Sequence, residues 1–476
     1  MSDLSNKTLK GVFWSFVENI GTIGTSVFFG VILARLLSPE DFGLLGMTNV
    51  FVLFAQVFID SGFSQALIQK DKCTEKDYNN VFWFNLGVSI IIYVIIYISS
   101  PYVGLFFKQN NLSLFIKVVS LGLIVSALTI VNQTKLTRRL EFKKQAKIGF
   151  LSVLFGGCLG VISAMSGFGV WSLAIRILTT QMIRMIGLIY IEKWKPSFYF
   201  SFGQLKHMFS FGSRILMVNS IAITFKNSFN VFIGKFYSSG TLGLYTQANI
   251  YSSLPADSLV AIVSRVSFPV FSTLQNSKEE MKQVAKNMML FTMFITFSLF
   301  FLMLSVADSF FYFVLGEKWL PAVPFFRILC FAYMFLPMHI FNQNIMNASG
   351  RSDLFFRSEV IKYIVFVFLL TIGVLSNIYI LVSVMAIQYF LGYFINAFFA
   401  SSLINYSIKE QLLDVARPFF LGIFTGVTSF LVKLVWNEMS IASFLFQIFV
   451  GIASFAIGFI FFGKKYLYII RNSYLK

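Results

Sequence analysis

Long apolar segments recur along almost the whole chain, and their length constrains the fold more than any other feature. Each holds roughly 20–25 residues, which is what a helix rising ~1.5 Å per residue needs to cross ~30 Å of hydrocarbon. The short alternating segments that are typical of a membrane barrel are missing. We therefore expect an all-α integral membrane protein with about fourteen transmembrane helices, at residues 11–36, 43–68, 80–104, 113–134, 147–167, 169–191, 207–234, 242–273, 287–315, 322–347, 355–376, 378–404, 414–436 and 441–463.

Charged residues are scarce and unevenly placed. They make up 12% of the sequence, against ~25% in a soluble protein. The net charge is nevertheless +18, because Lys and Arg gather in alternate connections such as 135–147 and 192–206. The cytoplasmic loops of membrane proteins carry this excess. We predict a multi-pass protein of the cytoplasmic membrane with both termini in the cytoplasm, and we do not expect nucleic acid as a partner.

One short segment of the sequence occurs twice. The letters ARLLSPEDFGLLGMTNVF at 34–51 are matched 200 positions later by GKFYSSGTLGLYTQANIY, and a weaker match at an offset of 210 follows. Six expected spans separate the two starts, and because six is even, both copies insert in the same orientation. We predict two six-helix lobes related as a parallel repeat, followed by two further helices. These parts cover residues 1–195, 196–406 and 407–476.

Several stretches of the chain resemble a known family of membrane transporters. They are LKGVFWSF near the start, ARLLSPEDFGLLGM at 34–47, FIDSGFSQALIQ at 58–69 and LGEKWLPAVPFFRILC at 315–330. They are similar to the polysaccharide-transporter branch of the MOP exporter superfamily, the Wzx-type flippases, which are related to MATE drug exporters. The resemblance implies a MATE-like, V-shaped transporter that flips an undecaprenyl-diphosphate-linked oligosaccharide of O-antigen, capsule or exopolysaccharide. It also implies membrane lipids, a glycan polymerase and glycosyltransferases of the same pathway as partners.

Cations within the expected spans are candidates for binding the diphosphate of such a substrate. Unpaired charge is costly inside a membrane, so a cavity that admits a diphosphate should offer cations. Arginine can also bind phosphate oxygens with two parallel hydrogen bonds. The alternative is that these side chains reach the membrane surface, since each lies seven or eight residues from the end of a span. The candidates are Arg214, Arg184, Arg176, Lys226 and Arg265.

Acidic and neutral polar residues in the spans give a second set of candidates. Glu18, Asp257 and Asp60 could bind a coupling Na⁺ or H⁺, or pair with the cations. The neutral residues are spaced at helical intervals and could line a wet cavity, or pack helices tightly against each other. These cavity candidates are Asn19, Thr22, Asn219, Thr224 and Asn227.

Three functions remain open at this level. The first is the oligosaccharide flippase, and the second is a cation-coupled multidrug exporter of MATE type. Five span cations against three acids favour an anionic cargo over a cationic drug. A membrane glycan polymerase or ligase is the third, but its chemistry needs larger outer loops than those expected here. Three cysteines and two histidines show no metal-ligand spacing, so we expect a transporter without metal, cofactor or catalytic residues.

Overall fold

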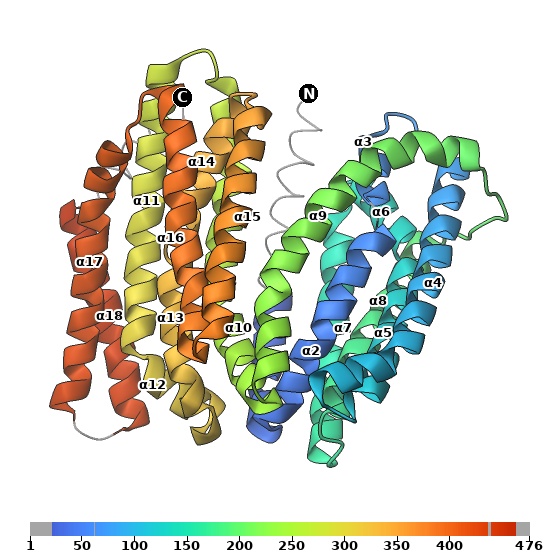
Figure 1. Ribbon diagram of the computed structural model, residues 1–476, viewed down its shortest axis with the longest axis horizontal. Helices are drawn as coiled ribbons and strands as arrows, with labels where there is room; N and C mark the ends of the chain where they lie inside the picture. Colours follow the sequence, from blue (N-terminus) through green and yellow to red (C-terminus); the bar gives the residue numbers. More distant parts are fainter. Residues whose placement is uncertain (1–20, 61, 437–438, 463–476) are drawn as a thin grey trace. The chain divides into compact units, whose positions relative to one another are not determined.

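The computed structural model describes residues 21–60, 62–436 and 439–462, without the side chains of 204–215 and 218–219. Helices make up almost all of this part of the chain, as the apolar segments predict (Figure 1). The chain divides into two compact units, unit 1 at Met1–Gly243 and unit 2 at Leu244–Lys476. The division by repeat at residues 195 and 406 stays a prediction.

Unit 1 contains the first helices of the chain. They are Gly21–Leu36, α2 (Pro39–Asp60), α3 (Phe63–Gln69), α4 (Glu75–Phe107), α5 (Leu112–Ala127), α6 (Ile130–Arg138), α7 (Phe142–Met165), α8 (Trp171–Glu192), α9 (Phe202–Phe236) and the first residues of α10 (Ser239–Thr273). Glycines allow close packing here, because a Cβ at Gly157 would overlap the ring of Phe29.

Unit 2 holds the remainder of α10 and the later helices. These are α11 (Lys278–Ser305), α12 (Ala307–Phe310), the π-helix η1 (Phe311–Leu315), the 3₁₀-helix η2 (Glu317–Ala322), α13 (Val323–Tyr333), α14 (Leu336–Ala348), α15 (Ser352–Leu375), α16 (Ile378–Ile404), α17 (Ile408–Val435) and α18 (Ile441–Phe462). Aromatic rings fill its interior, and Trp319 and Tyr333 are almost completely buried.

Twelve segments in the described part of the chain are long and apolar enough to cross a membrane. They correspond to twelve of the expected spans, so the all-α, multi-pass fold is confirmed. The other two expected spans are 11–36 and 207–234. The first overlaps the 16-residue apolar helix Gly21–Leu36, and the second lies within α9. The exact count of fourteen therefore stays a prediction.

Several spans that the sequence predicts as continuous are broken, among them 287–315, which divides into α11, α12 and η1. The expected span 43–68 divides into α2 and α3, where Gly62 adopts a left-handed backbone with φ of 70°. The spans 113–134 and 322–347 divide likewise, into α5 with α6 and α13 with α14. Hydropathy averaged over ~19 residues does not register such breaks, because each break is only a few residues long.

The repeated segment forms two equivalent turns in unit 1. Ser38 accepts a hydrogen bond from the backbone N–H of Asp41 at 3.3 Å, and Ser238 accepts one from Thr241 at 3.1 Å. These are the N-terminal caps of α2 and α10. The matching of caps 200 residues apart agrees with the internal repeat.

The same two turns cross at their glycines. A Cβ at Gly43 would overlap the carbonyl oxygen of Ser239, and a Cβ at Gly243 would overlap that of Pro39. Pro39 and Ser239 are themselves 200 positions apart, so the two contacts are related by the repeat. Only glycine permits this approach of one backbone to another.

Candidate functional site

Arg176 of α8 is bound to its own unit. Its Nη2 donates to the carbonyl oxygen of Ser26 at 3.0 Å and to the Ser26 hydroxyl at 2.8 Å. These bonds join α8 to helix Gly21–Leu36 within unit 1. The guanidinium is half-buried, so part of it stays accessible. Arg176 therefore contributes to packing, whatever else it binds.

Three other candidate cations have no protein partner within the described part of the chain. Arg184 of α8 is half-exposed, and Lys226 of α9 is exposed, both in unit 1. Arg265 of α10 is exposed in unit 2. Each lies inside an expected span, where an unpaired charge must face water or an anion. The side chain of Arg214 lies outside the described residues.

The three candidate acids differ in their surroundings. Asp60, at the end of α2, is half-exposed and accepts a hydrogen bond from Ser64 at 2.5 Å. Asp257 of α10 is exposed and has no hydrogen bond or ion pair within the described part of the chain. Glu18 lies outside the described residues. No acid among those described pairs with any of the candidate cations.

The neutral polar candidates bond mainly to their own helix. Thr224 donates to the Ser220 carbonyl at 2.8 Å and is exposed. Asn227 donates to the Ile223 carbonyl at 2.9 Å and is 8% exposed. Thr22 is half-exposed and is not without a partner. The remaining two, Asn19 and the side chain of Asn219, lie outside the described residues.

A polar pocket opens within unit 1, between α2, α3, α6 and α9. Its volume is about 400 Å³. The polar part of its lining consists of Gln56, Asp60, Ser64, Gln133, Thr134 and Thr137. Of these, only Asp60 was singled out in the sequence. The helical spacing of polar residues could not identify the others, because they come from separate helices that meet only where the chain breaks after α2 and after α5.

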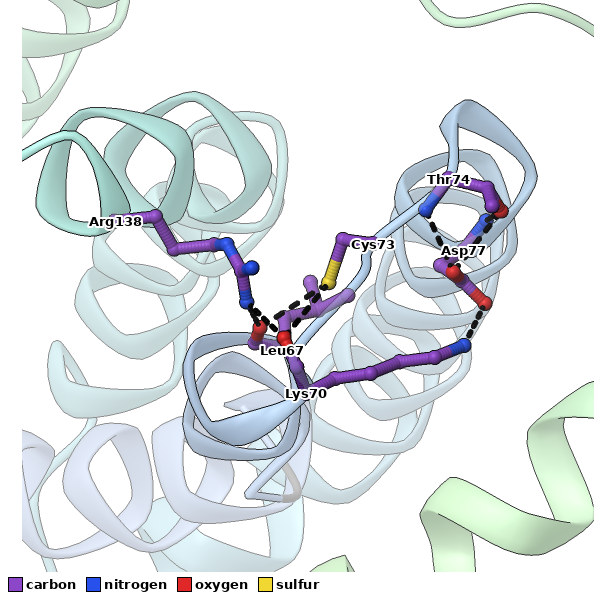
Figure 2. A network of polar contacts seen from close by, with 6 residues as sticks. All are labelled: Leu67, Lys70, Cys73, Thr74, Asp77 and Arg138. Carbon is purple, nitrogen blue, oxygen red and sulfur yellow. Dashed lines mark hydrogen bonds and ion pairs between the residues drawn. The ribbon is translucent and has the colours of Figure 1, made fainter.

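Arg138, at the end of α6, holds α3 beside this pocket (Figure 2). Its guanidinium donates to the carbonyl oxygens of Leu67, Ile68 and Lys70, the last at 2.7 Å. Carbonyls at a helix C-terminus lack partners within the helix. Arg138 supplies those partners at the end of α3 and so fixes α3 against α6.

The connection that follows α3 is ordered by the same network. Thr74 and Asp77 form a capping box at the start of α4, and Lys70 bonds Asp77 at 2.8 Å. The Cys73 thiol points toward the Leu67 carbonyl, at 3.2 Å (Figure 2). Burial raises the pKa of this thiol. The short loop is therefore a rigid link between two helices.

A buried ionic cluster in unit 2 was missed in the sequence. Lys362 of α15 is 6% exposed, and its ammonium lies 2.5 Å from Glu359 and 3.0 Å from His339 Nε2. Gln343 of α14 donates to the same carboxylate at 3.1 Å. The sequence did offer one indication of this cluster, since Glu359 and Lys362 lie three residues apart inside an expected span. Nothing in the sequence could place His339 beside it.

The chain matches a family model over residues 32–324, more than half of its length, described as "Polysaccharide biosynthesis protein". It is 25% identical to the teichuronic acid biosynthesis protein TuaB of Bacillus subtilis, with 92% of each chain covered. The lipopolysaccharide biosynthesis protein WzxC of Escherichia coli is 24% identical over 91% of this chain and 89% of its own. The succinoglycan biosynthesis transport protein ExoT of Rhizobium meliloti is 26% identical over 67% and 65%.

Solved structures agree on the fold. The chain is similar to the lipid II flippase MurJ, with a TM-score of 0.75 at 14% identity, covering 95% of this chain and 99% of MurJ. A MATE family transporter of the MOP superfamily gives a TM-score of 0.57 at 16% identity, covering 82% and 96%. The resemblance noted in the sequence is thus confirmed by both kinds of comparison. This multi-pass membrane protein belongs to the polysaccharide biosynthesis protein family, with a fold shared by MurJ and MATE transporters.

Proposed function

We propose that the chain is a flippase for an undecaprenyl-diphosphate-linked oligosaccharide. It moves the repeat unit of a surface polysaccharide from the inner to the outer leaflet of the cytoplasmic membrane by alternating access. Family membership and the relatives named for teichuronic acid, lipopolysaccharide and succinoglycan support a polysaccharide cargo. The name of ExoT, a transport protein, supports transport rather than catalysis.

The unpaired cations carry the proposal at the level of residues. Arg184 and Lys226 in unit 1 and Arg265 in unit 2 are accessible charges in expected spans, without protein partners among the described residues. A diphosphate supplies the negative charge that such groups lack. Cations that pair with no acid among the described residues would repel a cationic drug, and this observation disfavours the multidrug exporter.

The proposal also covers the energy source of transport and the enzymes that act before and after it. We propose that a gradient of Na⁺ or H⁺ drives the cycle, with Asp257 as the accessible carboxylate that binds the ion. Both termini face the cytoplasm, where the glycosyltransferases of the pathway assemble the cargo. A glycan polymerase receives it on the outer side.

The test is replacement of an unpaired cation in a strain whose own copy is deleted. Arg184→Ala should reduce surface-glycan export by about 10–100-fold, because a hydrogen bond to a charged group contributes ~1.5–3 kcal/mol. The lipid-linked oligosaccharide should accumulate in the inner leaflet, while the amount of inserted protein stays the same. Arg214→Ala should behave alike.

The matched control is Arg351→Ala. Arg351 is exposed and pairs with Asp353 outside the expected spans, so export should be unchanged. Normal export by the Arg184 and Arg214 variants would contradict a cationic path for the diphosphate. If deletion alters drug tolerance and no lipid-linked sugar accumulates, the multidrug exporter is the better assignment.

A further inference from the structure

The polar pocket of unit 1 lies where the cargo would enter. Its residues come from the second, fourth and seventh expected spans, close to the ends that the charge pattern places at the cytoplasm. Its volume of about 400 Å³ falls within the ~300–1,000 Å³ of small-molecule sites. Apolar side chains complete the wall, namely Leu53, Val57, Ile68, Ile130, Leu216 and Ile223.

Several polar atoms of the pocket have no protein partner within the described part of the chain. The side-chain amide of Gln133 makes no hydrogen bond with any described residue. Gln56 accepts from Ser126 at 3.2 Å through Oε1, which leaves its Nε2 free. Asp60 accepts from Ser64 through Oδ1, which leaves Oδ2 free. Free donors and free acceptors therefore line one cavity, where a bound ligand could pair with both.

The charge of the pocket limits what it can bind. Among the described residues, its lining contains one carboxylate, Asp60, and no cation. The described lining therefore offers a diphosphate a negative charge and no cation to pair with. A lone metal ion would use only oxygen ligands within ~2.6 Å and would leave the amide N–H groups of Gln56 and Gln133 unsatisfied. It would also fill little of the volume.

A sugar ring meets each of these requirements. Its hydroxyls both donate and accept, and so can pair with amide N–H, amide oxygen and carboxylate at once. Its C–H faces can rest on aliphatic side chains such as Leu53 and Ile130. We propose that this pocket binds a neutral sugar of the head group, with Gln133, Gln56 and Asp60 as its hydrogen-bonding residues. The proposal rests on the proposed function.

Binding of two lipids to the full-length protein in nanodiscs tests this. One probe is the lipid-linked oligosaccharide extracted from cells in which the chain is deleted, and the other is sugar-free undecaprenyl diphosphate. Wild-type protein should prefer the first. Gln133→Leu and Asp60→Asn should each weaken binding of the glycosylated lipid about tenfold, the effect of one to two hydrogen bonds, and leave the sugar-free lipid unaffected.

Gln65→Leu is the matched control. Gln65 lies on α3, is exposed, and does not line the pocket, so both affinities should stay at the wild-type values. The Gln133 side chain makes no hydrogen bond with the described residues, so its replacement removes none of those that hold the fold there. Wild-type affinities in both pocket variants would overturn the proposal. An equal loss for both lipids would also overturn it, because the pocket would then act on the diphosphate, the lipid or the fold.

Two further outcomes separate this proposal from others. If Asp60→Asn removes a dependence of transport on Na⁺ while the preference for the glycosylated lipid persists, the pocket is a cation site and the sugar assignment is wrong. If no lipid-linked oligosaccharide accumulates on deletion, or wild-type protein binds neither probe, the proposed function itself fails. The first result concerns only the pocket, and the second concerns the cargo.

Discussion

Lys362 lies 6% exposed in the interior of unit 2, with Glu359 2.5 Å and His339 3.0 Å from its ammonium. Removing one member of a buried ion pair leaves the other charge uncompensated, at a cost of ~3–5 kcal/mol. We expect Lys362→Ala to lower the unfolding temperature of the detergent-solubilised protein strongly. Thermal unfolding followed by circular dichroism measures this.

The double variant Glu359→Gln with Lys362→Gln is the control. It removes both charges and keeps hydrogen-bonding groups, so it should recover most of the lost stability. An unfolding temperature for Lys362→Ala equal to that of wild type would mean that the cluster is hydrated and does not stabilise unit 2. A double variant as unstable as the single one would assign the effect to packing, since the Lys362 chain lies beside Gly392.

Residue types and positions in spans could be predicted, but residue partners could not. Periodicity and charge identified Arg176 and Arg184 together, eight positions apart on one helix. The structure gives them different roles. Arg176 bonds Ser26, which lies 150 positions away in the sequence, whereas Arg184 has no partner among the described residues. Similarly, Gln133 joins the candidates only once the broken helices are known. Contacts between distant segments decide both cases, and no local pattern carries that information.

At the scale of elements, the crossing of α2 and α10 leaves no room for a side chain at either glycine. Gly43 and Gly243 face backbone carbonyls, which cannot rotate away as a side chain can. We expect Gly243→Ala to force the two turns apart and to destabilise unit 1 by ~1–3 kcal/mol, the usual cost of overpacking. Gly43→Ala should have a similar effect because the repeat makes the two sites equivalent. Thermal unfolding of the purified variants measures it.

Gly87→Ala, within α4, is the matched control. A Cβ there would meet nothing within 4 Å. Alanine favours a helix over glycine by ~1 kcal/mol, so this variant should be neutral or slightly more stable. Equal stability of the Gly43, Gly243 and Gly87 variants would show that the crossing relaxes freely.

The lengths of most elements could be predicted and their breaks could not. Apolar length located twelve spans, because crossing a bilayer fixes the number of residues needed, although the span expected at 287–315 lies at Lys278–Ser305. The break at Gly62 depends on one backbone conformation, which glycine permits but does not impose. Repeated caps at Ser38 and Ser238 were within reach of the sequence, since serine before a helix is a recognised cap.

At the scale of the whole molecule, the charge pattern assigns a side of the membrane to each connection. The loop between α3 and α4 contains Cys73 and is expected to face the cytoplasm. With Cys158 and Cys330 replaced by alanine, Cys73 is the single thiol of the chain. We expect no reaction with a membrane-impermeant maleimide in intact cells, and reaction in inside-out vesicles. Labelling of the intact cells would reverse the orientation and contradict the cytoplasmic placement of both termini.

The pH dependence of this labelling tests the local structure at the same time. Burial raises the pKa of Cys73, so less thiolate, the reactive form, is present at neutral pH than in a free cysteine. Below that raised pKa the rate in inside-out vesicles should grow about tenfold for each pH unit. Unfolding in denaturant should expose the thiol, lower its pKa and increase the rate at pH 7. A rate at pH 7 that denaturant does not change would show that Cys73 is already hydrated, and that the network around Arg138 leaves the loop open.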